Sequence, residues 1–193
     1  AVDKYLKASH NVIFNDIVKT YGDPDFLLSF TSSSTGDFSL EPLDPTVVSI
    51  IGSNTSILSA GTSIVSVTQM SDSNYKSLTG SFTITVNKAN LKINITDIVK
   101  NYNDPDFYLS ATSSSTGSFQ YFPLKLGVVS INGSSTTILS AGSTVVSVTQ
   151  APDLNYNSAT TTFTVLINKT DYLYDSPYEL MLVGYFLCRK NKI

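Results

Sequence analysis

The stretch Asp16-Ile-Val-Lys-Thr-Tyr-Gly-Asp-Pro-Asp-Phe26 returns as Asp97-Ile-Val-Lys-Asn-Tyr-Asn-Asp-Pro-Asp-Phe107, 81 positions later. The same shift aligns residues 16–88 with residues 97–169 without a gap, and 46 of these 73 paired positions are identical. Self-similarity at a fixed period is the signature of a repeat architecture. The chain therefore holds two copies of one unit of about 80 residues, a size at which a small domain folds.

The composition is that of a globular but weakly charged chain. Of its 193 residues 41% are hydrophobic and 14% are charged, against about 25% charged in ordinary globular domains. The formal net charge of −3 and a sequence pI near 4.9 leave no basic footprint for phosphates, so we expect no nucleic-acid partner. The single cysteine, Cys188, lies outside both copies, so the repeats fold without disulfides. No stretch approaches the roughly 18 apolar residues of a membrane span.

The repeat also sets the predicted domain boundaries. Lys7-Ala8 precedes the first copy as Lys88-Ala89 precedes the second, so the N-terminal residues take the place of a preceding repeat's last strand or form a linker. The chain begins with Ala1 rather than methionine, so either a leader was removed or this is a segment of a longer array. The predicted segments are residues 1–10 (preceding repeat or linker), 11–89 (repeat 1), 90–170 (repeat 2) and 171–193 (C-terminal docking tail).

The junction between the copies is very short. Lys88-Ala89-Asn90-Leu91 holds neither proline nor glycine, so the last strand of one unit must run almost directly into the next unit. A short junction without flexible residues limits interdomain motion. We therefore expect an elongated, semi-rigid rod.

Each copy reads as short β-strands with no helical periodicity. Residues 81–87 alternate, with Phe82, Ile84 and Val86 on the face expected to be buried. The preceding strand, residues 61–69, should pair with it as a hairpin. The buried positions expected on this preceding strand are Val65 and Val67. In the second copy they are Val146, Val148, Phe163, Val165 and Ile167. The other strands expected in repeat 1 are residues 12–14, 26–30, 38–40, 47–51 and 55–58. About seven strands with turns every 8–12 residues predict an all-β fold of two immunoglobulin-like β-sandwiches, with a barrel as the alternative.

Four short motifs recur in order in both copies. In the first copy they are Tyr21-Gly-Asp-Pro-Asp-Phe26, Ala60-Gly61, Val65-Ser-Val-Thr-Gln69 and Asn74-Tyr75. With them, the chain resembles the Ig-like MBG or YDG-type repeats of large bacterial surface adhesins. The resemblance covers about residues 11–169, and the second copy departs from it at Asn103 and at residues 125–127, which lie in predicted turns.

The resemblance implies a stalk, spacer or adhesive module and no catalytic residue or cofactor; similar repeats occur in structural proteins of large DNA viruses. We therefore expect a non-enzymatic structural or adhesive protein, extracellular, on a cell surface or on a virion as a capsid-associated decoration or fibre. Its expected partners are proteins of that assembly and a host receptor or glycan. The alternative is a carbohydrate- or receptor-binding module of a secreted adhesin, which should expose aromatic side chains on the loops around Asp23, Asp72 and Tyr75.

Acidic pairs stand at the start of each copy. Pro24 between the acids of the first pair favours a plain turn in which the carboxylates accept backbone N–H groups. A calcium site is the alternative, with Asp72 and Asn74 as further oxygen donors, and a general acid–base pair is a weaker one because no pocket-forming insertion accompanies the acids. The acids are Asp23, Asp25, Asp104 and Asp106.

Other reactive side chains have plain interpretations. Tyr75 and its copy Tyr156 should each pack over a sandwich end with the hydroxyl bonded to backbone. His10, the sole histidine, lacks the convergent ligands of a metal site and is expected on the surface or in a linker. An isopeptide bond would need a lysine, an acceptor and a catalytic acid buried together. The candidate lysines are Lys7, Lys88 and Lys169.

The pattern breaks after Lys169. Residues 179–188 are mostly apolar and a basic run, residues 189–192, follows. An exposed tail this apolar would aggregate, so we expect it to dock on a neighbouring chain or domain, with homo-oligomer formation as one outcome. A β-strand shared with a partner and a membrane-surface anchor are the alternatives. The expected docking residues are Leu180, Met181, Leu182, Val183, Tyr185, Phe186 and Leu187.

Overall fold

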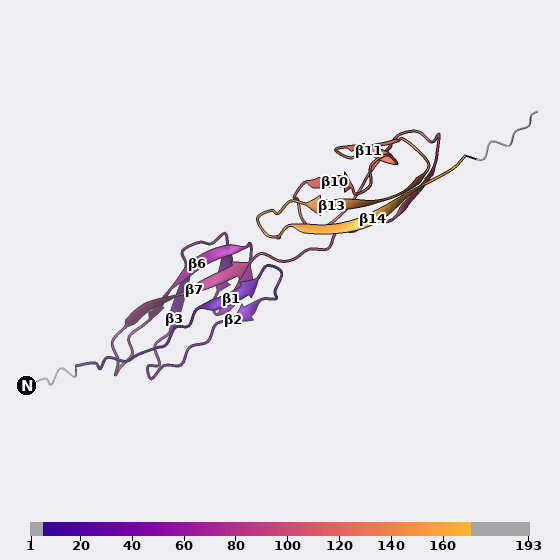
Figure 1. Cartoon of the computed structure of the whole chain (residues 1–193). Helices are drawn as coiled ribbons and strands as arrows, with labels where there is room; N and C mark the ends of the chain where they lie inside the picture. The colour runs from indigo at the N-terminus through magenta and orange to yellow at the C-terminus, as the bar shows by residue number, and fades with distance from the viewer. Residues whose placement is uncertain (1–5, 171–193) are drawn as a thin grey trace, which may run out of the picture.

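The computed structural model describes residues 6–170, and within them the chain is all β. Two β-sandwiches follow one another end to end along a single long axis, as Figure 1 shows. Repeat 1 contains β1 (Ile17–Thr20), β2 (Phe26–Leu27), β3 (Phe38–Pro42), β4 (Val48–Ile51), β5 (Asn54–Ile57), β6 (Gly61–Gln69) and β7 (Leu78–Asn87). Repeat 2 contains β8 (Ile98–Asn101), β9 (Phe107–Tyr108), β10 (Phe119–Pro123), β11 (Val129–Asn132), β12 (Ser135–Ile138), β13 (Gly142–Gln150) and β14 (Ala159–Asn168). The predicted pair of immunoglobulin-like sandwiches is confirmed.

Each sandwich has a four-stranded and a three-stranded sheet. In repeat 1 the strand orders are β1-β7-β6-β3 and β2-β5-β4, and in repeat 2 they are β8-β14-β13-β10 and β9-β12-β11. The predicted hairpin is confirmed, since β6 and β7 pair antiparallel with Val65 opposite Phe82. In contrast, β1 pairs with β7 in parallel, with Ile17 beside Ile84. A parallel pair needs a long connection, so the first strand of each repeat reaches the last one across the whole unit.

The alternating positions form the cores. Val65, Val67 and Ile84 are 0% exposed, and Phe82 and Val86 are each 3% exposed. Their copies Val146, Val148, Phe163, Val165 and Ile167 are buried in the same way. Each repeat has its own core cluster, so the two sandwiches are separate packing units, as expected for domains.

Two strand predictions were wrong. Residues 12–14 form no strand; the first strand is β1, because the Asp16 carboxylate accepts the backbone N–H of Thr83 (2.7 Å) and aligns the following residues with β7. Val12 is still buried, at 5% exposed, so its apolar character reports core packing rather than ladder pairing. The strand predicted over residues 26–30 ends at Leu27. Beyond it Leu28 turns into the core, and its amide bonds to the Ser53 carbonyl.

A buried glutamine ties the end of each sandwich together. Gln150 is 0% exposed, and its Nε2 donates to the carbonyl oxygens of Ser115 (3.1 Å) and Gly117 (2.8 Å) while its Oε1 accepts from the Ser113 hydroxyl. Gln69 repeats this arrangement in repeat 1. A buried amide that meets its partners in this way fixes a loop that has no strand pairing of its own.

Replacing Gln150 with alanine should therefore destabilise repeat 2 by about 2–4 kcal/mol, because two carbonyls and one hydroxyl lose their partner in a buried site. The measurement is chemical denaturation followed by far-ultraviolet circular dichroism. Gln120→Ala is the matched control, since Gln120 is exposed on β10, and it should change stability by less than about 0.5 kcal/mol. Equal effects of the two substitutions would contradict the role of Gln150.

Candidate functional site: the joint between the repeats

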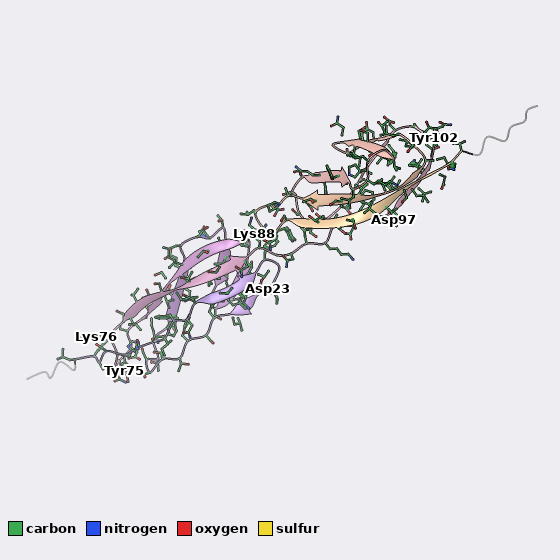
Figure 2. All side chains as sticks on the ribbon, viewed as in Figure 1. Asp23, Tyr75, Lys76, Lys88, Asp97 and Tyr102 are labelled. Carbon is green, nitrogen blue, oxygen red and sulfur yellow. The ribbon has the colours of Figure 1, made fainter. Side chains whose placement is uncertain are left out.

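The joint is formed by one end of repeat 1 and one loop of repeat 2. The loop connects β13 to β14, and the facing surface carries Tyr21, just after β1, and Ala60, just before β6. Lys88 lies between the two sandwiches, as Figure 2 shows. Residues far apart in the sequence therefore meet at the joint.

Three of the contacts across the joint define its geometry. The Asn155 Oδ1 accepts the backbone N–H of Ala60 at 2.9 Å. The ring of Tyr156 meets the ring of Tyr21 edge to face, with centroids 5.5 Å apart and planes at 83°. The Lys88 Nζ donates to the backbone carbonyl of Asp153. A directed hydrogen bond beside an aromatic pair restricts both the bend and the rotation of one sandwich on the other.

The linker itself belongs to the following repeat. The Ala89 amide donates to the Asn155 carbonyl (2.9 Å), and the Asn157 amide donates back to the Ala89 carbonyl (2.9 Å). Ala8 makes the same pair of bonds with Asn74 and Lys76 in repeat 1. Each unit thus starts at the alanine of its Lys-Ala pair. The boundaries at residues 11 and 90 stay predictions, and the sequence does not show the two-bond pairing of Ala8 and Ala89.

One carboxylate shapes the loop that reaches across. The Asp153 Oδ1 accepts the backbone N–H groups of Asn155 and Tyr156, both at 2.8 Å. Its Oδ2 accepts from the Ser115 hydroxyl (2.8 Å) and from the Thr116 amide (2.8 Å) and hydroxyl (3.2 Å). These hydrogen bonds hold the pKa of Asp153 well below its usual range. The Thr116 amide contributes most to the lowering, and the Ser115 hydroxyl comes next. Asp72 has the same arrangement in repeat 1, and its pKa is lowered in the same way, first by the Thr35 amide.

These lowered pKa values predict acid sensitivity. A carboxylate whose pKa is lower in the folded than in the unfolded chain stabilises the fold fully above the unfolded value, about 4, and loses that contribution as the pH falls below it. We expect the urea concentration at the unfolding midpoint to decrease as the pH is lowered from about 5 to about 2. In the variant Asp153→Asn, this urea concentration should already be lower than in the wild type at pH 7, and it should change less with pH.

The control for this prediction is Asp37→Asn. Asp37 is exposed, and within residues 6–170 its carboxylate accepts no hydrogen bond. This variant should follow the wild-type pH profile. An Asp153→Asn profile parallel to that of the wild type would contradict the assignment.

The four predicted acids all lie in turns, where each accepts a hydrogen bond. Asp23 and Asp104 accept the amides of Thr20 (2.9 Å) and Asn101 (2.8 Å). Asp25 and Asp106 accept the hydroxyls of Ser56 (2.7 Å) and Thr137 (2.8 Å). This geometry agrees with the turn interpretation.

The calcium alternative does not fit the arrangement. Its further donors, Asp72 and Asn74, belong to the loop next to Tyr75, and Figure 2 places Tyr75 and Asp23 at opposite ends of repeat 1. Within residues 6–170 no three His, Cys, Asp or Glu side chains gather closely enough to hold a metal ion. In the joint, the β13–β14 loop of repeat 2 contacts the preceding repeat, and the equivalent β6–β7 loop of repeat 1 lies away from the acids of its own unit.

The tyrosine prediction was right about the place and wrong about the bond. Tyr75 and Tyr156 are both half-buried at sandwich ends, but their hydroxyls make no hydrogen bond within the described part of the chain. Their rings make the contacts instead: Tyr156 with Tyr21, and Tyr75 with His10 at 5.3 Å between centroids. His10 is also more than a surface residue, because its Nε2 lies 2.9 Å from the Gln69 Oε1. The sequence did not predict this contact, because His10 and Gln69 are 59 positions apart.

The remaining predicted residues do not form a reactive cluster in the described chain. Lys7, Lys88 and Lys169 are exposed, whereas an isopeptide bond requires a buried triad. No helix of residues 6–170 is long and apolar enough to span a membrane. Cys188 and the docking residues from Leu180 to Leu187 lie outside the described residues.

Comparisons with known proteins add similarities of architecture. No protein-family model and no curated protein matches the chain. Similar solved structures include Drosophila N-cadherin EC1-4 (14% identity, 84% of this chain, 50% of that chain, TM-score 0.39) and the titin domains z1z2 in complex with telethonin (14%, 86%, 99%, 0.39). Domains 4 and 5 of the S-layer protein SbsC are also similar (14%, 83%, 100%, 0.33). The chain thus spans half the length of the N-cadherin fragment, and its fold is defined by the strand topology above.

The joint residues Tyr21, Ala60 and Asn155 were not predicted. One signal was present: each of them is identical in the other copy, at Tyr102, Ala141 and Asn74. Identity between copies at positions outside the alternating core pattern was the available clue, but it does not say which residue meets which.

Proposed function

We propose that this chain is a non-enzymatic structural or adhesive protein of an extracellular surface, in which the Ig-like repeats act as a stiff spacer. The observation that carries the proposal is the direct joint, where Asn155 bonds to Ala60 and Tyr156 packs on Tyr21. A spacer must hold its ends apart, and fixed contacts at each joint keep consecutive units from folding back. The MBG/YDG-type resemblance supports the same role.

The surface chemistry also supports a spacer. The ring of Tyr156 is half-buried in its contact with Tyr21, whereas a ligand-binding site at this loop end would present the ring to a ligand. Hydroxyl side chains are exposed at equivalent strand positions of the two repeats, for example Ser81 on β7 and Thr162 on β14. Such a surface stays soluble with little charge, which suits a module that separates two functional ends.

Loosening the joint tests this proposal. In the wild type we expect the backbone residual dipolar couplings of both repeats to fit one common alignment tensor, because the contacts fix one repeat on the other. The double variant Asn155→Ala, Tyr156→Ala should give two different tensors, with the fold of each repeat retained. Asn74→Ala, at the far end of repeat 1, should behave like the wild type. Independent tensors in the wild type would exclude a stiff joint.

The tail would attach the spacer to its assembly, whether cell surface or virion. At about 10 µM, where an association worth roughly 7–8 kcal/mol is populated, we expect the full chain to associate and a chain ending at Thr170 to be monomeric. Multi-angle light scattering measures the difference. If the full chain and the chain ending at Thr170 were both monomeric, the tail would have no role in the proposed assembly.

A second candidate function, carbohydrate binding, is favoured by one hollow in repeat 1. It has a volume of about 530 Å³, and its polar lining is Asn11, Asn15, Ser29, Thr31, Ser32 and Ser33. In repeat 2 the corresponding backbones are joined, since Asn94 and Thr112 exchange two hydrogen bonds (2.8 and 3.0 Å). Amide and hydroxyl groups around a hollow suit the hydroxyls of a sugar chain.

A glycan array tests this candidate. Binding of the wild type that is lost in Asn15→Ala and kept in Thr96→Ala, the equivalent position of repeat 2, would support it. Thr96 is exposed like Asn15, so the two variants are matched. An array without signal would leave the spacer as the function.

A further inference from the structure

Within residues 6–170, the far end of repeat 2 is an uncovered copy of the surface that repeat 1 uses in the joint. A hollow of about 270 Å³ lies there, lined by Tyr102, Ser140, Ala141, Lys169 and Thr170. A shift of 81 positions relates these residues to Tyr21, Ser59, Ala60, Lys88 and Ala89. We call the five residues from Tyr102 to Thr170 the socket.

Within residues 6–170 no loop covers the socket, whereas the loop of repeat 2 covers the equivalent surface of repeat 1. Ala60 is 8% exposed under the loop of repeat 2, whereas Ala141 is only half-buried. Tyr102 is 39% exposed, while Tyr21 is half-buried against Tyr156. The Ala60 amide donates to Asn155, but within residues 6–170 the Ala141 amide has no acceptor. The socket is thus a donor beside an aromatic ring in the described chain, with neither partner in place.

The opposite end of the molecule carries the complementary loop. The Asp72 Oδ1 accepts the amides of Asn74 and Tyr75, both at 2.7 Å, as Asp153 does for Asn155 and Tyr156. The Asn74–Tyr75 loop, which we call the plug, therefore has the same backbone shape as the loop in the joint. Asn74 is exposed, whereas its copy is half-buried. Tyr75 and Tyr102 lie at the two extremes of the pair of sandwiches, as Figure 2 shows.

We propose that the socket of one chain binds the plug of a second copy, head to tail. The Asn74 Oδ1 would accept the Ala141 amide, and the Tyr75 ring would meet the Tyr102 ring, in the geometry of the internal joint. Plug and socket are different surfaces at opposite ends, so the contact is heterologous and does not close on itself. Repeated, it extends the two-repeat rod into a filament along the same axis.

The contact is weaker than the joint for two physical reasons. In the joint the chain holds the partners together, which gives a high effective concentration that two separate chains lack. In addition, Lys7–Ala8 of the incoming copy would occupy the place of Lys169–Thr170, which must turn aside. Both pairs are exposed, so this displacement costs little packing. We expect association at about 0.1–1 mM in solution.

Sedimentation velocity tests the proposal with a chain ending at Thr170, which keeps both cores, because the full chain is expected to associate through its tail at about 10 µM. The wild type should form species larger than a dimer as its concentration rises. Asn74→Lys destroys the plug and Tyr102→Ala the socket, and both positions are exposed, so folding should persist. Each variant alone should associate at least about tenfold more weakly. Their equimolar mixture should give dimers and nothing larger, because it contains one intact plug and one intact socket.

Disulfide trapping gives an independent readout. In a Cys188→Ser background, Asn74→Cys with Ala141→Cys should form a ladder of linked chains in glutathione disulfide, whereas Asn74→Cys alone should stop at dimers. A chain ending at Thr170 that stays monomeric at about 1 mM, or the absence of a ladder, would overturn the proposal. Association that persists in both variants but disappears on deletion of residues 171–193 would also overturn it, and would leave the spacer function intact.

Discussion

The Asp153 carboxylate accepts five hydrogen bonds from two separate segments, one in its own loop and one at Ser115 and Thr116. Those bonds give the β13–β14 loop the shape in which Asn155 faces Ala60 and Tyr156 faces Tyr21. A carboxylate saturated by backbone and hydroxyl donors is strongly held in its ionised form, so contacts within repeat 2 set the shape of the loop. The contacts between the two repeats thus depend on an interaction internal to one repeat.

The two repeats share this device but differ in how their cores are filled. Repeat 1 packs the ring of Phe30 against Phe14 and Phe38, whereas repeat 2 has Ala111 at the position of Phe30. The space there is taken by Tyr121, whose hydroxyl accepts the Ala111 amide at 3.0 Å. The smaller side chain lets two backbone segments pair in repeat 2, and the larger ring accompanies the polar hollow in repeat 1. Substitutions inside a common fold therefore give the repeats different surfaces.

A repeat whose one end is a plug and whose other end is a socket has a direction. Each unit contacts only its neighbours, as in other linear arrays, and the same few residues are used at each contact. The joint needs no large apolar interface, because the linker alanine already pairs with the following loop through two backbone hydrogen bonds. Length and stiffness then come from the number of units, while attachment and recognition are left to residues outside the joint.

The sequence by itself determined the two copies, the all-β class, the β6–β7 hairpin and the buried faces of Val65, Phe82 and Ile84. Period-two alternation predicts which face of a strand is buried, and the same pattern occurs in both copies. Tertiary structure decided that β1 runs parallel to β7, that Gln69 and Gln150 are hubs, and that Asn155 reaches Ala60 across 95 positions. Local pattern cannot determine these, because a hydrogen bond between distant residues depends on where the folded chain places them and leaves no period in the sequence.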